Sequence, residues 1–291
     1  MKIATKATCL AFLSALSPLA WTCSQDGSSG FLPPNNLSLP LTEKSVGLTY
    51  EQFTKVVDKV EDRYASIVRY YGGNLKIHRQ WTNARVNAGT YRDGNNWHIN
   101  LYGGFARHPA ITPDGYAMVI CHELGHHIGG APKKLRTQTA SWSSNEGQSD
   151  YFAALKCLRT LFENENHKYV IQRMYVPDTV KEKCEESFDR ENERNLCIRT
   201  SMAGLSVGYV MADSQRKDRP SFDTPDENEV SQNIEKHPGV QCRLDTYFMG
   251  SVCEVSHEVV LSQRSEVKGT CHPSLGYREG VRPACWFRPN E

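Results

Sequence analysis

The residues with the clearest potential for chemistry lie in VICHELGHHIGG, residues 119–130, which contains H-E-x-x-H as His122, Glu123 and His126. On a helix, residues four positions apart lie on one face, so both imidazoles can point at one metal ion. Glu123 lies about 100° around the helix from His122. From there its carboxylate can take a proton from a water on the open side of the metal. This spacing predicts a hydrolytic metal site that still needs a third ligand.

Catalytic zinc normally has three protein ligands and one water, and two continuations of the motif could supply the third. In the pattern H-E-x-x-H-x-x-G-x-x-H the final position is Pro132, which has no donor atom, so this continuation fails. The other takes a glutamate from the next helix, and NEGQSD offers Glu146, with Asp150 one turn further on the same face. We therefore predict His122, His126 and Glu146 as ligands. Asp150 is expected to accept a hydrogen bond from the far nitrogen of a ligand histidine.

The combination of HELGH and NEGQSD resembles the gluzincin class of zincin metallopeptidases, and its N-E-x-x-x-D form is similar to that of the thermolysin group. The resemblance covers about a third of the chain. It implies an α+β, zincin-like fold, one Zn²⁺ per chain, a peptide or protein substrate, and Glu123 as the general base. It also implies that an edge strand just before the active-site helix binds extended substrate; here that strand would be WHINLY, residues 97–102.

Hydrolysis of a peptide bond also needs a donor to the developing oxyanion. The stretch KHPGVQCR is a loose match to the HP segment of gluzincins related to prenyl-protein endopeptidases. His237, Arg243 and Tyr209 are the candidates for this role. Two alternatives to a secreted endopeptidase stay open: a zincin-fold binding module with feeble turnover, and a zinc amidase that acts on cell-wall material.

The N-terminus predicts export. Lys2 and Lys6 precede a mostly apolar stretch, which is typical of a secretory signal peptide over residues 1–22. The stretch is too short and too interrupted for a membrane span. Two alternatives stay open at Cys23: lipidation, which would anchor the protein to a membrane, or ordinary cleavage at or just past this residue. We expect a periplasmic or extracellular protein.

Cysteine usage agrees with export. None of the cysteines forms a C-x-x-C pair, which argues against a cysteine-only zinc site. Eight cysteines follow Cys23 and permit four disulfides, for which ~105 connectivities exist. A bridge between Cys121 and Cys157 would join the two metal-bearing helices; alternatively each pairs elsewhere. Cys184 and Cys197 suit a local bridge. The last four cysteines suit a C-terminal subdomain: Cys242, Cys253, Cys271 and Cys285.

Composition excludes other broad classes. The formal net charge is +1, so the chain lacks the broad basic field of a nucleic-acid-binding protein, and we expect no nucleic-acid partner. No segment beyond the N-terminal stretch is long and uncharged enough for a transmembrane helix.

The elements that must position the site follow from periodicity. Residues 49–71 repeat apolar side chains every three or four positions and predict a helix. Residues 75–102 predict a small, mostly antiparallel sheet. A helix from about 112 to 129 carries HELGH, and the next begins near Ser143 or Ser144 and carries NEGQSD. Further helical patterns cover about 179–190, 193–213 and 239–249.

We expect four segments along the chain. A signal peptide over residues 1–22 is followed by a flexible linker over 23–45, which is rich in Ser, Pro, Asn and Gly. Residues 46–216 are expected to form the catalytic domain, and residues 217–291 a Cys-rich C-terminal subdomain.

Overall fold

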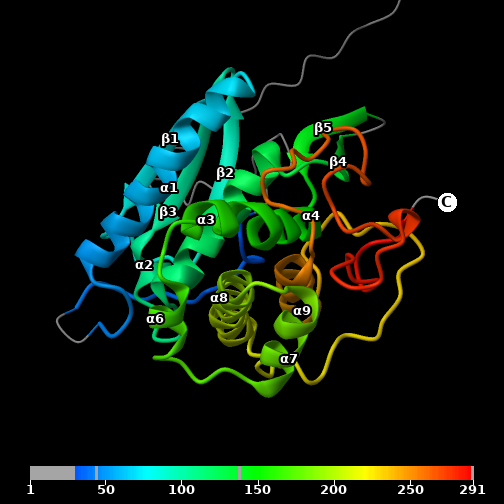
Figure 1. Ribbon diagram of the computed structural model, residues 1–291. Helices are drawn as coiled ribbons and strands as arrows, with labels where there is room; N and C mark the ends of the chain where they lie inside the picture. Colours follow the sequence, from blue (N-terminus) through cyan, green and yellow to red (C-terminus); the bar gives the residue numbers. More distant parts are fainter. Residues whose placement is uncertain (1–29, 43–44, 137–138, 290–291) are drawn as a thin grey trace, which may run out of the picture.

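The computed structural model describes residues 30–42, 45–136 and 139–289, and over these ranges the chain is an α+β protein with small sheets (Figure 1). The expected signal peptide and Cys23 lie outside the described residues. None of the described helices combines the length and the apolar character that crossing a membrane requires.

Helix α1, Tyr50–Tyr70, forms where the apolar repeat predicts it. Thr49 begins it with a capping box: the Gln52 amide donates to the Thr49 hydroxyl at 3.1 Å, and the Thr49 amide donates to the Gln52 side chain at 2.9 Å. One face of the helix is buried in the core: Phe53, Val57, Val60, Tyr64 and Val68.

The three-stranded sheet has the order β1-β3-β2, from β1 (Asn74–Gln80), β2 (Ala88–Asp93) and β3 (Asn96–Tyr102). The pair β2–β3 is antiparallel, but β1–β3 is parallel. The sheet is therefore mixed, and the expectation of a mostly antiparallel sheet is wrong for these strands. Residues 81–87 carry the chain from one edge of the sheet to the other, and no local turn signal marks that crossing.

This topology also corrects the expected substrate-binding strand. WHINLY belongs to β3, which lies in the centre of the sheet with both neighbours paired, so it has no open edge. The strand that contacts the HELGH helix from an edge position is β2.

Helix α3, Pro113–Ile128, carries HELGH and begins at Thr112, whose hydroxyl accepts from the Gly115 amide at 3.0 Å. It follows the short helix α2, Gly103–Ala106. Helices α1 and α3 pack against each other and against the sheet, and almost the whole of α3 is buried. The metal motif is therefore held by the core of the molecule.

Strands β4 (Lys133–Arg136) and β5 (Thr139–Ser144) pair as an antiparallel hairpin between the two helices, where no strand was predicted. Helix α4, Glu146–Phe152, then begins at Asn145, whose side chain accepts from the Gln148 amide at 2.9 Å. The predicted start at residue 143 or 144 is too early because these residues end β5. The helix continues through a π-helical turn, η1 (Ala153–Leu158), into α5 (Arg159–Phe162).

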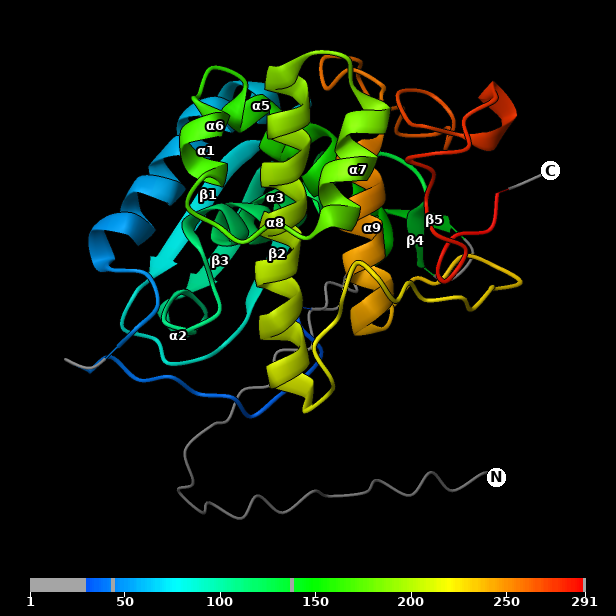
Figure 2. The same ribbon diagram turned by 60° about the horizontal axis from the view of Figure 1, so that its bottom comes forward.

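The remaining helices are α6 (His167–Ile171), α7 (Asp178–Ser187), α8 (Glu191–Gln215), α9 (Val240–Val252) and the 3-10 turn η2 (Pro273–Leu275). Figure 2 shows α7, α8 and α9 side by side, and α8 packs on α3 while α9 packs on α4. Residues 253–289 are mostly irregular and include contacts to α4, as where Arg282 Nε donates to Gln148 Oε1 at 2.7 Å. The division of the chain at residue 216 stays a prediction.

The described ranges contain four disulfides. Cys121–Cys157 joins α3 to the helix that carries NEGQSD, and Cys184–Cys197 joins α7 to α8. The last four cysteines pair among themselves, as Cys242–Cys285 and Cys253–Cys271.

Residues 30–42 do not behave as a flexible linker. Phe31 and Leu32 are buried, with exposures of 0% and 1%. Backbone hydrogen bonds join Phe31 to Ala88 and Leu39 to Ala84. The Ser, Pro and Asn content of this segment is typical of a linker, but two of its apolar side chains are buried in the core and hold the segment in place.

Candidate metal centre

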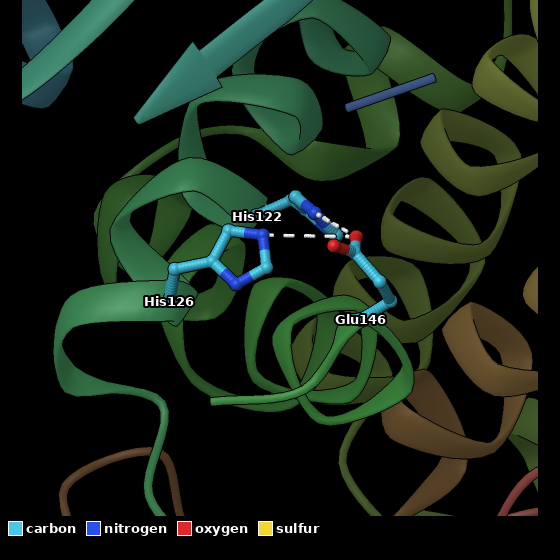
Figure 3. A group of neighbouring side chains, drawn as sticks. All are labelled: His122, His126 and Glu146. Atoms are coloured by element: carbon cyan, nitrogen blue, oxygen red, sulfur yellow. Dashed lines mark ion pairs between the residues drawn. The ribbon is translucent and has the colours of Figure 1, made fainter. Parts of the chain in front are cut away.

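His122, His126 and Glu146 converge on one point between α3 and α4 (Figure 3). Glu146 Oε2 lies 3.2 Å from His122 Nε2 and 3.6 Å from His126 Nε2. Ligands about 2.0–2.1 Å from a tetrahedral zinc ion are about 3.3–3.4 Å apart, so these separations fit such an ion. The three side chains are at most 1% exposed and could hold a metal ion.

Asp150 orients His122. Its Oδ1 lies 2.7 Å from His122 Nδ1. Burial raises the pKa of Asp150, but Arg243 and His122 outweigh burial and hold the pKa at about 2. The carboxylate can therefore only accept, and His122 Nδ1 must donate. Burial lowers the pKa of His122, whereas Asp150 raises it, to about 9. Once His122 has given up its second proton, Nε2 presents its lone pair towards Glu146, as a ligand histidine requires.

His126 is oriented by the end of β5. Its Nδ1 lies 2.8 Å from the carbonyl oxygen of Ser144, which can only accept, so Nδ1 carries the proton. Ser149 Oγ lies 3.0 Å from the same nitrogen. Burial lowers the pKa of His126 well below its ordinary value, and the ring is neutral at pH 7. Its Nε2 has no hydrogen-bond partner among the described residues and faces Glu146.

Glu123 is fully buried, and neither of its carboxylate oxygens has a hydrogen-bond partner within the described part of the chain. Burial raises its pKa to about 8, and the nearby charge of Glu146 acts in the same direction. A carboxylate next to two imidazoles and with no committed hydrogen bonds has the features of a proton acceptor for chemistry at that point.

Arg243 and Tyr247, which lie one turn apart on α9, both donate hydrogen bonds to the Asp150 carboxylate. Arg243 Nε and Nη2 donate to the two oxygens of Asp150 at 2.7 and 2.8 Å, and Tyr247 Oη donates to Asp150 Oδ1 at 2.5 Å. Arg243 Nη1 also donates to the carbonyl oxygen of Phe31, at 2.8 Å. Arg243 therefore holds the carboxylate that orients His122.

Of the other two candidate donors, the structure brings one to the site. His237 Nε2 lies 3.4 Å from Glu146 Oε2 and 2.8 Å from the carbonyl oxygen of Gly30. Tyr209 lies on α8 under Arg219 and lines a separate cavity of about 510 Å³, whose lining contains none of the ligand residues. His237 thus stays a candidate, and Tyr209 lies away from this centre.

The sequence reasoning missed several contacts at the centre, and only one of them, that of Tyr247, had a signal in the sequence. Lys134, on β4, donates to Glu146 Oε1 at 2.8 Å, and both groups are buried. Residues 30 and 31 reach the site from far back in the chain. Tyr247 could have been found, because it follows Arg243 by four positions and so shares its helix face.

Comparisons with known proteins give no relative: no family model, no curated protein and no solved structure matches this chain.

Proposed function

We propose that this chain is an exported zinc-dependent peptidase of the zincin type that hydrolyses peptide bonds. The observation that carries the proposal is the buried group of His122, His126 and Glu146 with Glu123 beside it. Two imidazoles and one carboxylate form the donor set of many catalytic zinc sites. A general base with no committed hydrogen bonds is expected of a hydrolase and has no purpose in a site that only binds.

Each residue of the site has its own role in the proposed hydrolysis. His122, His126 and Glu146 would hold zinc, which when bound supplies a water of pKa about 7 and polarises the substrate carbonyl. Glu123 would take a proton from that water and later deliver it to the leaving amine. His237 would donate a hydrogen bond to the carbonyl oxygen as charge develops there. Asp150 and Arg243 would keep His122 in one orientation.

Export is part of the proposal. Four disulfides support an oxidising compartment, and the N-terminal sequence is typical of a signal peptide.

The first test is metal content by mass spectrometry on the purified mature protein, beside Glu146→Ala. We expect one zinc per wild-type chain and strongly reduced zinc in the variant. Equal zinc in both proteins would place the third ligand elsewhere and remove the gluzincin assignment.

The second test is cleavage of a peptide library by wild type, by Glu123→Gln and by Glu258→Gln, a matched change at an exposed glutamate. Glu123→Gln should keep zinc and lose hydrolysis by roughly 10²-fold or more, whereas Glu258→Gln should match wild type. Normal turnover by Glu123→Gln would refute the assigned base.

A further inference from the structure

Residues 30–32 lie at the metal centre although they precede HELGH by about ninety positions. The Phe31 ring packs edge-on against the His122 ring, with centroids 4.8 Å apart, and is fully buried. Helix α3 and this segment are thus in direct contact at the ligand that Asp150 orients.

One backbone hydrogen bond and the Asn87 side chain hold this segment beside the start of β2. The Phe31 amide donates to the Ala88 carbonyl at 2.9 Å, and Asn87 accepts from the Leu32 amide at 2.9 Å while its Nδ2 donates to the Leu32 carbonyl at 3.2 Å. Ala88 begins β2, the edge strand next to α3. Open edges of sheets are where extended peptides bind, through main-chain hydrogen bonds.

Two of the three carbonyl oxygens of the segment, those of Gly30 and Phe31, face polar groups of the centre. The Gly30 oxygen lies 2.8 Å from His237 Nε2, the atom that is 3.4 Å from Glu146 Oε2. The next carbonyl, that of Phe31, accepts from Arg243 Nη1 at 2.8 Å. The Gly30–Phe31 peptide is therefore placed beside the candidate oxyanion donor, with a large apolar side chain on its C-terminal side.

We infer that residues 30–32 occupy, within their own chain, the position of a peptide substrate at the metal centre, and this inference rests on the proposed function. The peptides that fit carry a small residue followed by a large apolar one. A Cβ added at Gly30 would lie 2.8 Å from the Ala88 carbonyl oxygen and 2.9 Å from the Asn87 side chain, so the residue before Phe31 has no room.

An external peptide must displace this segment. A tethered ligand competes at an effective concentration in the millimolar range for short flexible connections. The apparent dissociation constant for an external peptide equals the intrinsic constant divided by the fraction of molecules in which the site is free. The segment therefore acts as a built-in competitor that has to move before turnover of another peptide.

The test measures binding of a fluorescent peptide with the sequence of residues 28–37, SSGFLPPNNL, to the full chain carrying Glu123→Gln with zinc present. Two further variants loosen the segment: Phe31→Ser removes the buried ring, and Gly30→Val introduces the clash with Ala88 while keeping that ring. Leu41→Ser is the matched control, because Leu41 lies outside residues 30–32 but in the same described stretch, residues 30–42, and is 50% exposed.

We expect Phe31→Ser and Gly30→Val to bind the peptide roughly ten- to hundredfold tighter than the parent, because they weaken the internal competitor. Leu41→Ser should bind like the parent. Equal binding by all four proteins, with thermal unfolding showing that each is folded, would overturn the inference.

Amide hydrogen exchange gives an independent readout. Adding the peptide should speed exchange of the Phe31 and Leu32 amides and leave that of Leu39, which bonds to Ala84, unchanged. Unchanged exchange at all three amides while peptide is bound would place the peptide elsewhere and refute the inference. Neither readout needs turnover, so the two proposals can fail separately. If the wild type hydrolyses peptides but the segment does not compete with them, only the inference is wrong. If the segment competes but the wild type hydrolyses no peptide, only the proposed peptidase activity is wrong.

Discussion

Arg243 and Arg199 are both buried, and each donates two hydrogen bonds to its own aspartate. Arg243 binds Asp150 at 2.7 and 2.8 Å, and Arg199 binds Asp114 at the same two distances. Each guanidinium also lies over a phenylalanine ring. Measured by the arginine and its aspartate alone, the two clusters are nearly identical.

The two clusters differ in the histidine that lies beside each arginine. Arg243 and Arg199 lie 3.4 Å from the Nδ1 atoms of His122 and His167, respectively. His122 Nδ1 also bonds to Asp150, and its pKa is raised to about 9. His167 has no hydrogen bond to a carboxylate within the described ranges, and burial followed by Arg199 lowers its pKa to about 4. The two clusters thus share the arginine–aspartate pair, and the direct hydrogen bond between carboxylate and imidazole, present only at His122, accounts for the difference between the two histidine pKa values.

The largest difference should appear in stability when each arginine is removed. Arg243→Met leaves Asp150, which has an exposure of 0%, without its guanidinium partner, so the free energy of unfolding should fall by about 3–5 kcal/mol. Arg199→Met should lower it by about 1–3 kcal/mol, because the Asp114 and Glu165 side chains are 17% and 37% exposed and can regain water. Urea denaturation measures both, and equal losses would contradict the contrast.

The second difference concerns the metal. Asp150→Asn should weaken zinc binding by roughly 10–100-fold, because the carboxylate that orients His122 loses its charge. Asp114→Asn makes the same chemical change in the other cluster and should leave zinc affinity unchanged. Competition with a chromophoric chelator measures both. Similar affinities for the two variants would show that Asp150 has no role in metal binding.

The third difference is in pH dependence. The folded pKa of His167, about 4, lies below its unfolded value of about 6.5. As pH falls through this window the unfolded chain takes up a proton that the folded chain refuses, so stability falls. Between pH 7 and pH 5 this histidine should remove about 1–2 kcal/mol. Above pH 7 it should have no effect.

His167→Gln isolates that contribution. Urea unfolding of wild type and variant at pH 7 and pH 5 should show a smaller loss of stability on acidification in the variant. Arg199 and Lys59 lower the pKa of His167, and Glu165 and Asp114 raise it. Identical acid dependence in the two proteins would mean that His167 protonates normally in the fold.

The smallest effect is expected at the rim of the Arg199 cluster. Glu165→Gln removes a carboxylate that is 37% exposed, so the free energy of unfolding should fall by only about 0.2–1 kcal/mol in a urea titration. A loss above about 2 kcal/mol would instead place Glu165 among the buried pairs.

Much of the candidate site could be predicted because its members lie close together on helices. His122 and His126 share a face of α3, and Glu146 and Asp150 share a face of α4. The caps at Thr112 and Asn145 are local hydrogen bonds of the kind that short sequence patterns report. For the same reason the predicted helices were found close to their true bounds, except where β5 delayed the start of α4.

Other parts had no local signal. The parallel pairing of β1 with β3 depends on residues 81–87, which carry the chain across the sheet. Alternation of apolar and polar side chains shows which side of a strand is buried, but it does not show whether the neighbouring strand is parallel or antiparallel. Lys134 meets Glu146 only because β5 packs on α3 and the paired strand β4 is thereby brought to Glu146. Tyr209 was named as a candidate donor, and its helix places it at another cavity.

The sequence by itself therefore determined the three side chains that could hold a metal ion, the helices that carry them and the cysteines available to join these helices. Tertiary structure alone decided that Arg243 stands behind Asp150, that His237 faces Glu146, and that Phe31 packs on His122. The physical reason is range. Helix periodicity and capping act over a few residues and can be read from spacing, whereas contacts between distant segments arise from burial of apolar surface, which has no direction along the chain.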